Sequence, residues 1–205
     1  TVQDMDKYGR YINYFNVYAI QVPSNETGTD HPNTAPDCGN YNSNVFYADT
    51  YFDTSFDLYN IHRLLYVQDD SALYDVLSDN TPFWDIAFVM VNTSMYGGAG
   101  GPFAVFSRHN DSNEIAIHEI GHSFAGLSDE YWAGFQYAHE NANMTQNINP
   151  ETTTWNLWLD YNETGIYPYE SPGTEWYRPH QNCKMRYLGT PFCSICKEQT
   201  IKSIY

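Results

Sequence analysis

The spacing of hydrophobic residues changes several times along the chain, and each spacing predicts a different element. Apolar residues recur at helical intervals over 58–67 and over 71–77, which predicts two helices. Residues 83–91, FWDIAFVMV, are almost all apolar and predict a central strand that is covered on both faces. Residues 11–22, YINYFNVYAIQV, are dense in β-favouring side chains and predict a strand that Pro23 ends.

Polar and glycine-rich stretches separate these runs. Residues 24–44 are rich in Asn, Thr, Pro, Gly and Asp and predict a long loop, and 45–56 has a less regular β pattern. The Gly-rich segment 96–102 precedes a short strand at 103–107. Because no Gly-Lys-Ser/Thr follows these glycines, the segment does not indicate a phosphate-binding loop.

The second half of the chain opens with a helix and is irregular after it. Ser112 or the following Asn can cap a helix that begins near Glu114. Residues 133–205 are rich in Asn, Pro and Trp, and within them only 194–204 has a helical pattern. We therefore expect an α/β (α+β) fold, with a small mixed sheet over one helix and an irregular C-terminal subdomain.

Composition and charge narrow the range of partners. Residues 1–205 are enough for a single domain and hardly enough for two. With 9 basic and 25 acidic residues, the net charge of −16 repels phosphate backbones and anionic lipid, which argues against nucleic acid and membrane surfaces as partners. No stretch approaches the roughly eighteen apolar residues of a membrane span. Clustered Asp and Asn oxygens suit a structural Ca²⁺.

The beginning of the chain and its surface composition suggest where the protein acts. A chain that opens at Thr1 without a Met is expected to be the trimmed product of a longer protein. The 19 tyrosines and many asparagines are typical of secreted proteins that meet carbohydrate or peptide ligands. We therefore expect a secreted or cell-surface protein of bacterial origin.

The four cysteines, Cys38, Cys183, Cys193 and Cys196, allow two interpretations. An even number in an exported protein favours disulfides, although the pairing cannot be read from sequence. The Cys-x-x-Cys pair and Cys183 can instead hold a structural zinc, with Cys38 or His180 as the fourth ligand. The sequence favours disulfides over zinc.

The segment His118-Glu119-Ile120-Gly121-His122 has the clearest chemical pattern. Residues four apart lie on one face of a helix, so the two imidazoles can bind one ion. Glu119 lies beside this pair and is free to take a proton from a zinc-bound water. The isoleucines on the rest of the helix predict that it is buried. The pattern therefore predicts a catalytic Zn²⁺ with Glu119 as general base.

Zinc in a catalytic site needs a third protein ligand and keeps one position open for water. Gly126 can adopt the left-handed conformation that ends a helix and turns the chain back. A carboxylate three residues later can then reach the ion, which makes Asp129 the preferred third ligand. Glu130 and Glu140 remain alternatives, and the Asp129-Glu130 pair can also serve calcium or the hydrogen bonds of the turn.

The stretch HEIGHSFAGLSDEY, residues 118–131, resembles the active-site segment of the M64 family of metallopeptidases, whose founding members cleave immunoglobulin A. A wider resemblance is to metzincins, in which a Gly-containing turn leads from the helix to the third ligand. In the usual metzincin pattern the Gly and the ligand each come one residue earlier than Gly126 and Asp129 do here. The M64 resemblance predicts this extra residue, and it implies a metzincin-like fold and cleavage of proteins, including host glycoproteins such as immunoglobulin A.

The resemblance also implies roles for two residues near the C-terminus. Metzincins have a Met-containing turn beneath the metal, and Met185 is placed to be its methionine, with plain core packing as the alternative. Tyr187 follows at the spacing at which some metzincins place a Tyr near the oxyanion. A phenol there can stabilise the tetrahedral intermediate, although packing in the core is an equal alternative.

An extended substrate is expected to pair with an edge strand of the sheet. The residues expected to form that strand are Phe103, Ala104, Val105 and Phe106. The function that follows is a zinc-dependent endopeptidase. One alternative is a catalytically silent module that binds a host glycoprotein, which the intact Glu119 argues against. Another is a zinc amidase or other hydrolase, which an extended substrate strand argues against.

Overall fold

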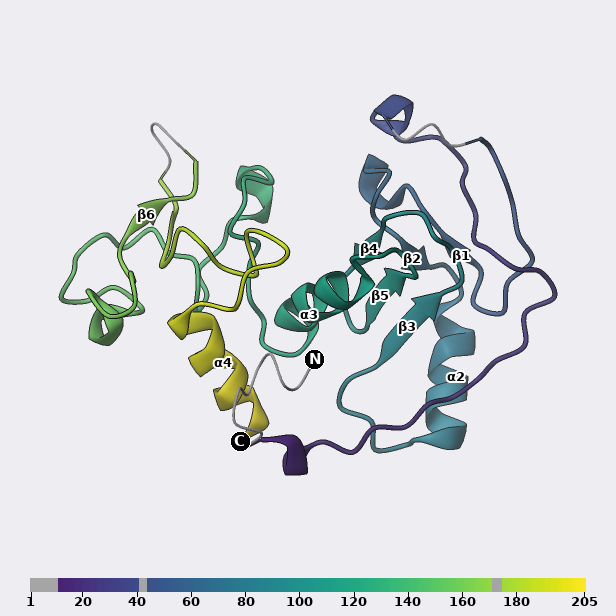
Figure 1. Cartoon of the computed structure of the whole chain (residues 1–205), viewed down its shortest axis with the longest axis horizontal. Helices are drawn as coiled ribbons and strands as arrows, with labels where there is room; N and C mark the ends of the chain where they lie inside the picture. The colour runs from purple at the N-terminus through teal and green to yellow at the C-terminus, as the bar shows by residue number, and fades with distance from the viewer. Residues whose placement is uncertain (1–10, 41–43, 171–174) are drawn as a thin grey trace. The chain divides into compact units, whose positions relative to one another are not determined.

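The computed structural model describes residues 11–40, 44–170 and 175–205 (Figure 1). The chain divides into two compact units: Asn16–Glu119, hereafter the sheet unit, and Thr1–Phe15 with Ile120–Tyr205, hereafter the C-terminal unit. The boundary falls inside helix α3 (Ser112–Ser123), which contributes residues to both units. The expectation of a single catalytic domain stays a prediction. Within the described residues, no helix combines the length and the apolar character needed to cross a membrane.

The sheet unit is built on a three-stranded sheet of order β3-β5-β4 (Figure 1). Its strands are β3 (Phe88–Val91), β4 (Gly98–Ala99) and β5 (Ala104–Ser107). β3 runs parallel to β5 and places Val89 opposite Val105. β4 runs antiparallel to β5 and places Ala99 opposite the same Val105. The strand predicted over 103–107 is therefore present as β5, and it lies in the middle of the sheet.

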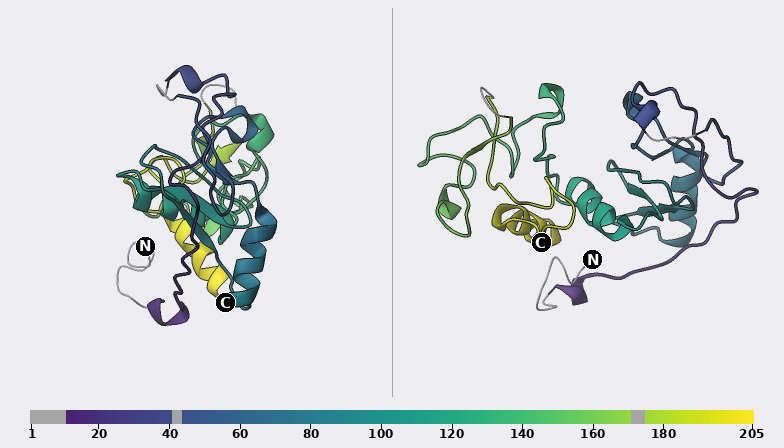
Figure 2. Two further views of the ribbon diagram at one scale, coloured as in Figure 1. Left: turned by 90° about the vertical axis from the view of Figure 1, so that its right-hand side faces the viewer. Right: turned by 45° about the horizontal axis from the view of Figure 1, so that its top comes forward.

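Helix α2 (Asp70–Asn80) packs beside this sheet (Figure 2). The carboxylate of Asp69 caps it by accepting a hydrogen bond of 3.0 Å from the backbone N–H three residues later. Leu73 and Leu77 are buried in one core cluster with valines of β3 and β5. Burial of each such leucine contributes about 1.5–3 kcal/mol. The helix predicted over 71–77 is confirmed and continues to Asn80.

Short elements complete the sheet unit. They are η2 (Cys38–Asn40), β1 (Thr54–Ser55), η3 (Leu58–Asn60) and β2 (Tyr66–Val67), of which β1 and β2 pair antiparallel. The loop predicted over 24–44 is confirmed apart from η2 and its residues 41–43, which lie outside the described part. The β pattern of 45–56 corresponds to an isolated bridge at Phe46 and to β1.

The C-terminal unit is mostly irregular, as predicted for 133–205. Its elements are η1 (Ile12–Tyr14), η4 (Phe135–Tyr137), η5 (Asn156–Trp158), β6 (Tyr167–Pro168), β7 (Tyr177–Arg178) and α4 (Ser194–Ile204). Met144 and Met185 are fully buried in its core. Trp155 is also buried, and its indole N–H donates a hydrogen bond of 2.8 Å to the carbonyl of Gly165. Helix α4 occupies the segment predicted to be helical, 194–204.

Two predicted elements are wrong because they lack the partners or the dihedral angles that they require. Residues 11–22 form no strand: they contain only η1, and Val17 and Tyr18 are 86% and 68% exposed. A strand needs a neighbour to pair with, and side-chain preference alone does not supply one. Residues 58–67 form no α-helix, because Tyr59 has a φ of 54°, which is left-handed backbone that cannot continue a right-handed helix.

The apolar run over 83–91 is a strand only in its second half, and it is not covered on both faces. β3 starts at Phe88 and lies at an edge of the sheet. Its side chains alternate in burial, so that Phe88 and Met90 are 45% and 65% exposed while Val89 is buried. A continuous apolar run cannot reveal the position of a strand within its sheet, and the central strand here is β5. The mixed α/β class is nevertheless the predicted one.

Candidate active site

Helix α3 places the two histidines of the motif one turn apart. Ile115, Ile117 and Ile120 are buried, with at most 5% of each side chain exposed, so the helix is a core element as predicted. His118 and Glu119 are each 7% exposed. The histidines are four residues apart on one continuous helix, and their rings therefore lie on the same face.

The turn after α3 is formed by Gly126. Its φ is 61°, and its N–H donates to the carbonyl of His122 at 3.1 Å, while Leu127 N–H donates to the carbonyl of Gly121 at 2.9 Å. Helices commonly end in this way, with a glycine in left-handed backbone and hydrogen bonds from the N–H groups after the helix to carbonyls of its last turn. The chain turns back at this point, and Asp129 comes to lie beside the helix.

A candidate metal centre is formed by His118, His122 and Asp129. Each offers one ligand atom, and the three atoms lie within 4.8 Å of one another. Nε2 of His122 is 3.3 Å from Oδ1 of Asp129. Around an ion with bonds of about 2.0 Å, tetrahedral ligands are about 3.3 Å apart, so this distance suits zinc. The residues present therefore fit the ion that the sequence predicts.

The orientation of His122 is fixed from its other side. Its Nδ1 lies 2.7 Å from the carbonyl oxygen of Leu127, and a carbonyl can only accept, so Nδ1 carries the proton. Nε2 is then the unprotonated nitrogen, which is the form that binds a metal. The turn formed by Gly126 thus supplies both this hydrogen bond and the position of Asp129.

The other two candidate carboxylates lie elsewhere. Glu130 is fully buried, and its Oε1 accepts from Nδ2 of Asn143 at 3.0 Å. Burial raises the pKa of Glu130 well above its usual value. Glu140 is exposed and accepts a hydrogen bond of 2.6 Å from the N–H of Gln146. Of the three carboxylates, Asp129 is the one whose oxygen joins the two histidines.

Met185 lies directly against α3 at Gly121, between the two histidines. A Cβ built at Gly121 would overlap the Met185 sulfur and would be 3.1 Å from its Cε. Met185 is fully buried, and its carbonyl accepts a hydrogen bond of 2.7 Å from the N–H of Glu130. The methionine therefore supports both the helix and the turn that contains Asp129. Its role as the methionine of a metzincin-like turn beneath a metal stays a prediction.

Tyr187 is not a core residue. Its side chain is 46% exposed, and the guanidinium of Arg186 lies over its ring at 4.6 Å from the centroid. The packing alternative for this tyrosine is therefore wrong, and its role as a donor to the oxyanion stays a prediction.

The predicted substrate strand is wrong. β5 is paired on both sides, and Phe103, Ala104 and Val105 are at most 6% exposed, so no peptide can add to it. The strand near Glu119 is β4, because a Cβ at Gly98 would lie 3.5 Å from Oε1 of Glu119. The predicted positions of β3 and β5 in the sheet are wrong for the same reason, because the order of strands depends on pairing between segments distant in sequence.

The cysteines are free thiols, which corrects the expectation of disulfides. Cys183, Cys193 and Cys196 lie together with Glu130. Glu130 is remote from the cysteines in sequence, so no local pattern indicates it as their partner. Cys38 belongs to the sheet unit and lies in a different group.

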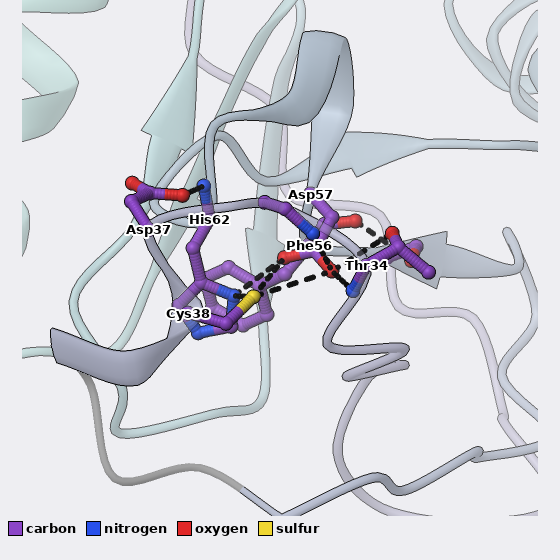
Figure 3. A network of polar contacts seen from close by, with 8 residues as sticks. Thr34, Asp37, Cys38, Phe56, Asp57 and His62 are labelled. Atoms are coloured by element: carbon purple, nitrogen blue, oxygen red, sulfur yellow. Dashed lines mark hydrogen bonds and ion pairs between the residues drawn. The ribbon is translucent and has the colours of Figure 1, made fainter.

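A polar network around His62 was not detected in the sequence either (Figure 3). Nδ1 of His62 is 2.5 Å from Oδ1 of Asp57 and 3.3 Å from Sγ of Cys38. A Cys-His-Asp catalytic triad uses opposite ring nitrogens for the acid and the nucleophile, so the use of one nitrogen here excludes it. Asp57 also accepts a hydrogen bond of 2.6 Å from the backbone N–H of Thr34. The backbone N–H of His62 donates one of 2.9 Å to Asp37. The network holds together the loops that contain η2 and η3.

Comparison with known families gives a match over most of the chain. The family sequence model described as IgA Peptidase M64 matches residues 1–173, and no curated protein matches the chain. The matched range includes α3 and Asp129, whereas Met185 and the three clustered cysteines lie beyond it. Since the match covers well over half of the 205 residues, this chain belongs to the M64 family of peptidases.

Proposed function

We propose that this peptidase is a zinc-dependent endopeptidase of the metzincin kind. His118, His122 and Asp129 would hold the ion. The observation that carries the proposal is the convergence of three ligand atoms within 4.8 Å on one helix and the turn after it. Bound zinc would lower the pKa of a water molecule to about 7 and polarise the scissile carbonyl.

Glu119 is the proposed general base. It follows the first histidine on α3, and its carboxylate lies against the backbone of β4 at Gly98. With 7% of its surface exposed, it is shielded from bulk water and yet next to the metal ligands. In this position it can take a proton from water and return it to the amine that leaves.

The substrate is proposed to lie along β4. Gly98 N–H points away from β5, because it donates to the carbonyl of Arg63 at 3.1 Å. The N–H and C=O of one strand residue point to the same side, so the Gly98 carbonyl also points away from β5, on the side of Arg63. An extended peptide can donate its own N–H to this carbonyl beside Glu119. Tyr187 is proposed to stabilise the oxyanion.

The test is Glu119→Gln, which keeps the size of the side chain and removes the base. We expect zinc content equal to that of the parent and hydrolysis of a quenched fluorescent peptide library lowered about 10²–10⁴-fold. The matched control is Glu140→Gln, an exposed glutamate outside the three-residue group. Full activity of the Glu119 variant would show that Glu119 is not the general base. A parent protein that cleaves no peptide or protein would favour the catalytically silent binding module.

The natural substrate is a second part of the proposal. The family description names immunoglobulin A, and we propose a host glycoprotein of this class, met outside the cell. Incubation of the purified chain with immunoglobulin A and with unrelated glycoproteins, followed by mass spectrometry of the fragments, tests it. Equal cleavage of immunoglobulin A and the unrelated glycoproteins would indicate an endopeptidase without preference for this class of substrate.

A further inference from the structure

Four side chains meet in the core of the C-terminal unit. They are Glu130 in the turn after α3, Cys183 shortly before Met185, and Cys193 and Cys196 at the start of α4. One potential ligand atom of each lies within 4.8 Å of the others. Glu130, Cys183 and Cys196 are fully buried, and Cys193 is 6% exposed. Three thiols and one carboxylate thus share a small, buried volume.

The carboxylate of Glu130 is incompletely satisfied there. Its Oε1 accepts from Nδ2 of Asn143 at 3.0 Å and lies 3.3 Å from Sγ of Cys196. Its Oε2 is buried and has no hydrogen-bond partner among the described residues. Buried polar atoms are nearly always paired, and a buried carboxylate needs a cation or a proton. A cation held by the thiols would supply the charge that this carboxylate needs.

Two distances among three of these groups agree with ligands of one tetrahedral ion. Sγ of Cys183 is 3.6 Å from Sγ of Cys196, and Sγ of Cys196 is 3.3 Å from Oε1 of Glu130. With Zn–S and Zn–O bonds of about 2.3 and 2.0 Å, the corresponding edges of a tetrahedron are about 3.8 and 3.5 Å. The Asp57–His62 contact of 2.5 Å is much shorter than the edge of about 3.3 Å between nitrogen and oxygen ligands of one zinc, so that group does not fit the ion.

A backbone N–H and the spacing of two of the cysteines also bear on the site. The N–H of Cys193 lies 3.4 Å from Sγ of Cys183. Burial raises the pKa of the Cys183 thiol, and this hydrogen bond acts in the opposite direction. Cys193 and Cys196 are three residues apart at the start of α4, the Cys-x-x-Cys spacing that recurs in structural zinc sites.

We propose that Glu130, Cys183, Cys193 and Cys196 bind a structural Zn²⁺, distinct from the ion at His118. All four positions are filled by protein, which leaves none for water and makes the site structural. Binding displaces the protons of the thiols. The ion would join the residue after Asp129, the turn with Met185 and helix α4. It would thereby hold the third catalytic ligand and the methionine in place.

The experiment uses a His118→Ala/His122→Ala chain, prepared under reducing conditions, in which the histidine site is removed. We expect about two zinc ions per chain in the parent and about one in this variant, by plasma mass spectrometry. Replacement of that zinc by Co²⁺ is expected to give an intense thiolate-to-cobalt charge-transfer band. A variant with no bound metal, or a cobalt spectrum without that band, would overturn the proposal. Because the readouts are stoichiometry and spectrum, they do not depend on peptidase activity.

Single substitutions locate the site within the chain. In the same double-variant chain, Cys196→Ser and Glu130→Gln are each expected to lower zinc affinity at least about tenfold in competition with a chelator. The matched control is Cys38→Ser, a cysteine of the sheet unit, which should retain the affinity. If Cys196→Ser does not fold, the cobalt spectrum of the His118→Ala/His122→Ala chain still tests whether thiolates bind the metal. A disulfide between two of the three cysteines, found by peptide mapping of the protein as isolated, would refute the proposal.

Discussion

The contact between Gly121 and Met185 makes Gly121→Ala a sharp test of how the candidate active site is packed. In an open helix this change stabilises by about 1 kcal/mol, because alanine is the better helix former. Here the new methyl group would overlap the Met185 sulfur and lie 3.1 Å from Cε of Met185 and 3.3 Å from the Phe192 ring. Met185 is fully buried and Phe192 is 3% exposed, so neither has free space to enter.

Overpacking of this kind costs about 1–3 kcal/mol. After the gain in helix propensity is subtracted, we expect a net loss of about 1 kcal/mol in the free energy of unfolding, and the sign is opposite to that expected from sequence alone. Urea unfolding followed by tryptophan fluorescence measures it, with zinc content measured in parallel. The control is Gly39→Ala, which has no neighbour within 4 Å and should change stability by less than about 0.5 kcal/mol.

A double substitution separates overpacking from other effects. Met185→Ala removes the side chain that Gly121→Ala would strike, so the second change should be less harmful in that background. A Gly121→Ala chain that is more stable than the parent would refute the close contact between α3 and Met185. Additive effects in the double variant would refute it as well.

Three further predictions concern single side chains. Asp129→Ala should lower zinc affinity at the histidine site at least about tenfold in chelator competition, and an unchanged affinity would reject it as ligand. Burial acts to raise the pKa of Asp57, but hydrogen bonds from His62, Thr34 and Ala35 outweigh it and lower the pKa. A carboxyl group whose pKa is lowered by folding stabilises the protein above its pKa in the unfolded chain, about 3.9, and this stabilisation is lost as the pH falls. Asp57→Asn should therefore flatten the decline below about pH 4 of the free energy of unfolding measured in urea. An unaltered decline would reject this linkage. Tyr187→Phe should lower kcat about a hundredfold at a similar KM, and a kcat equal to that of the parent would remove the phenol from the mechanism.

The two candidate metal-binding groups share the turn after α3. Asp129 belongs to the histidine group and Glu130 to the cysteine group, although they are neighbours in the chain. The N–H of Glu130 is bonded to the carbonyl of Met185, which fixes the backbone between them. Loss of the cysteine group is therefore expected to disturb the histidine group, whereas the reverse effect should be small because α3 is held by its own buried face.

Local geometry allowed the sequence to predict the core of the candidate site. The spacing of His118 and His122 on a helix follows from the helical repeat, and the turn at Gly126 follows from the freedom of glycine in left-handed backbone. The helix over 71–77 and the strand over 103–107 are also visible in the sequence, because each has a local apolar pattern.

Contacts between distant segments decided the rest. The sequence cannot tell which of two adjacent carboxylates is the third ligand. Asn143 and the cysteines hold Glu130 in the core, which leaves Asp129 beside the histidines. The place of β5 in the middle of its sheet depends on β3 and β4, which no property of its own residues reveals. The run over 11–22 has the composition of a strand but, in the part that the structure describes, no strand beside it. A helix encodes its own hydrogen bonds, whereas a strand, a third ligand or a cysteine cluster needs partners that only the folded chain supplies.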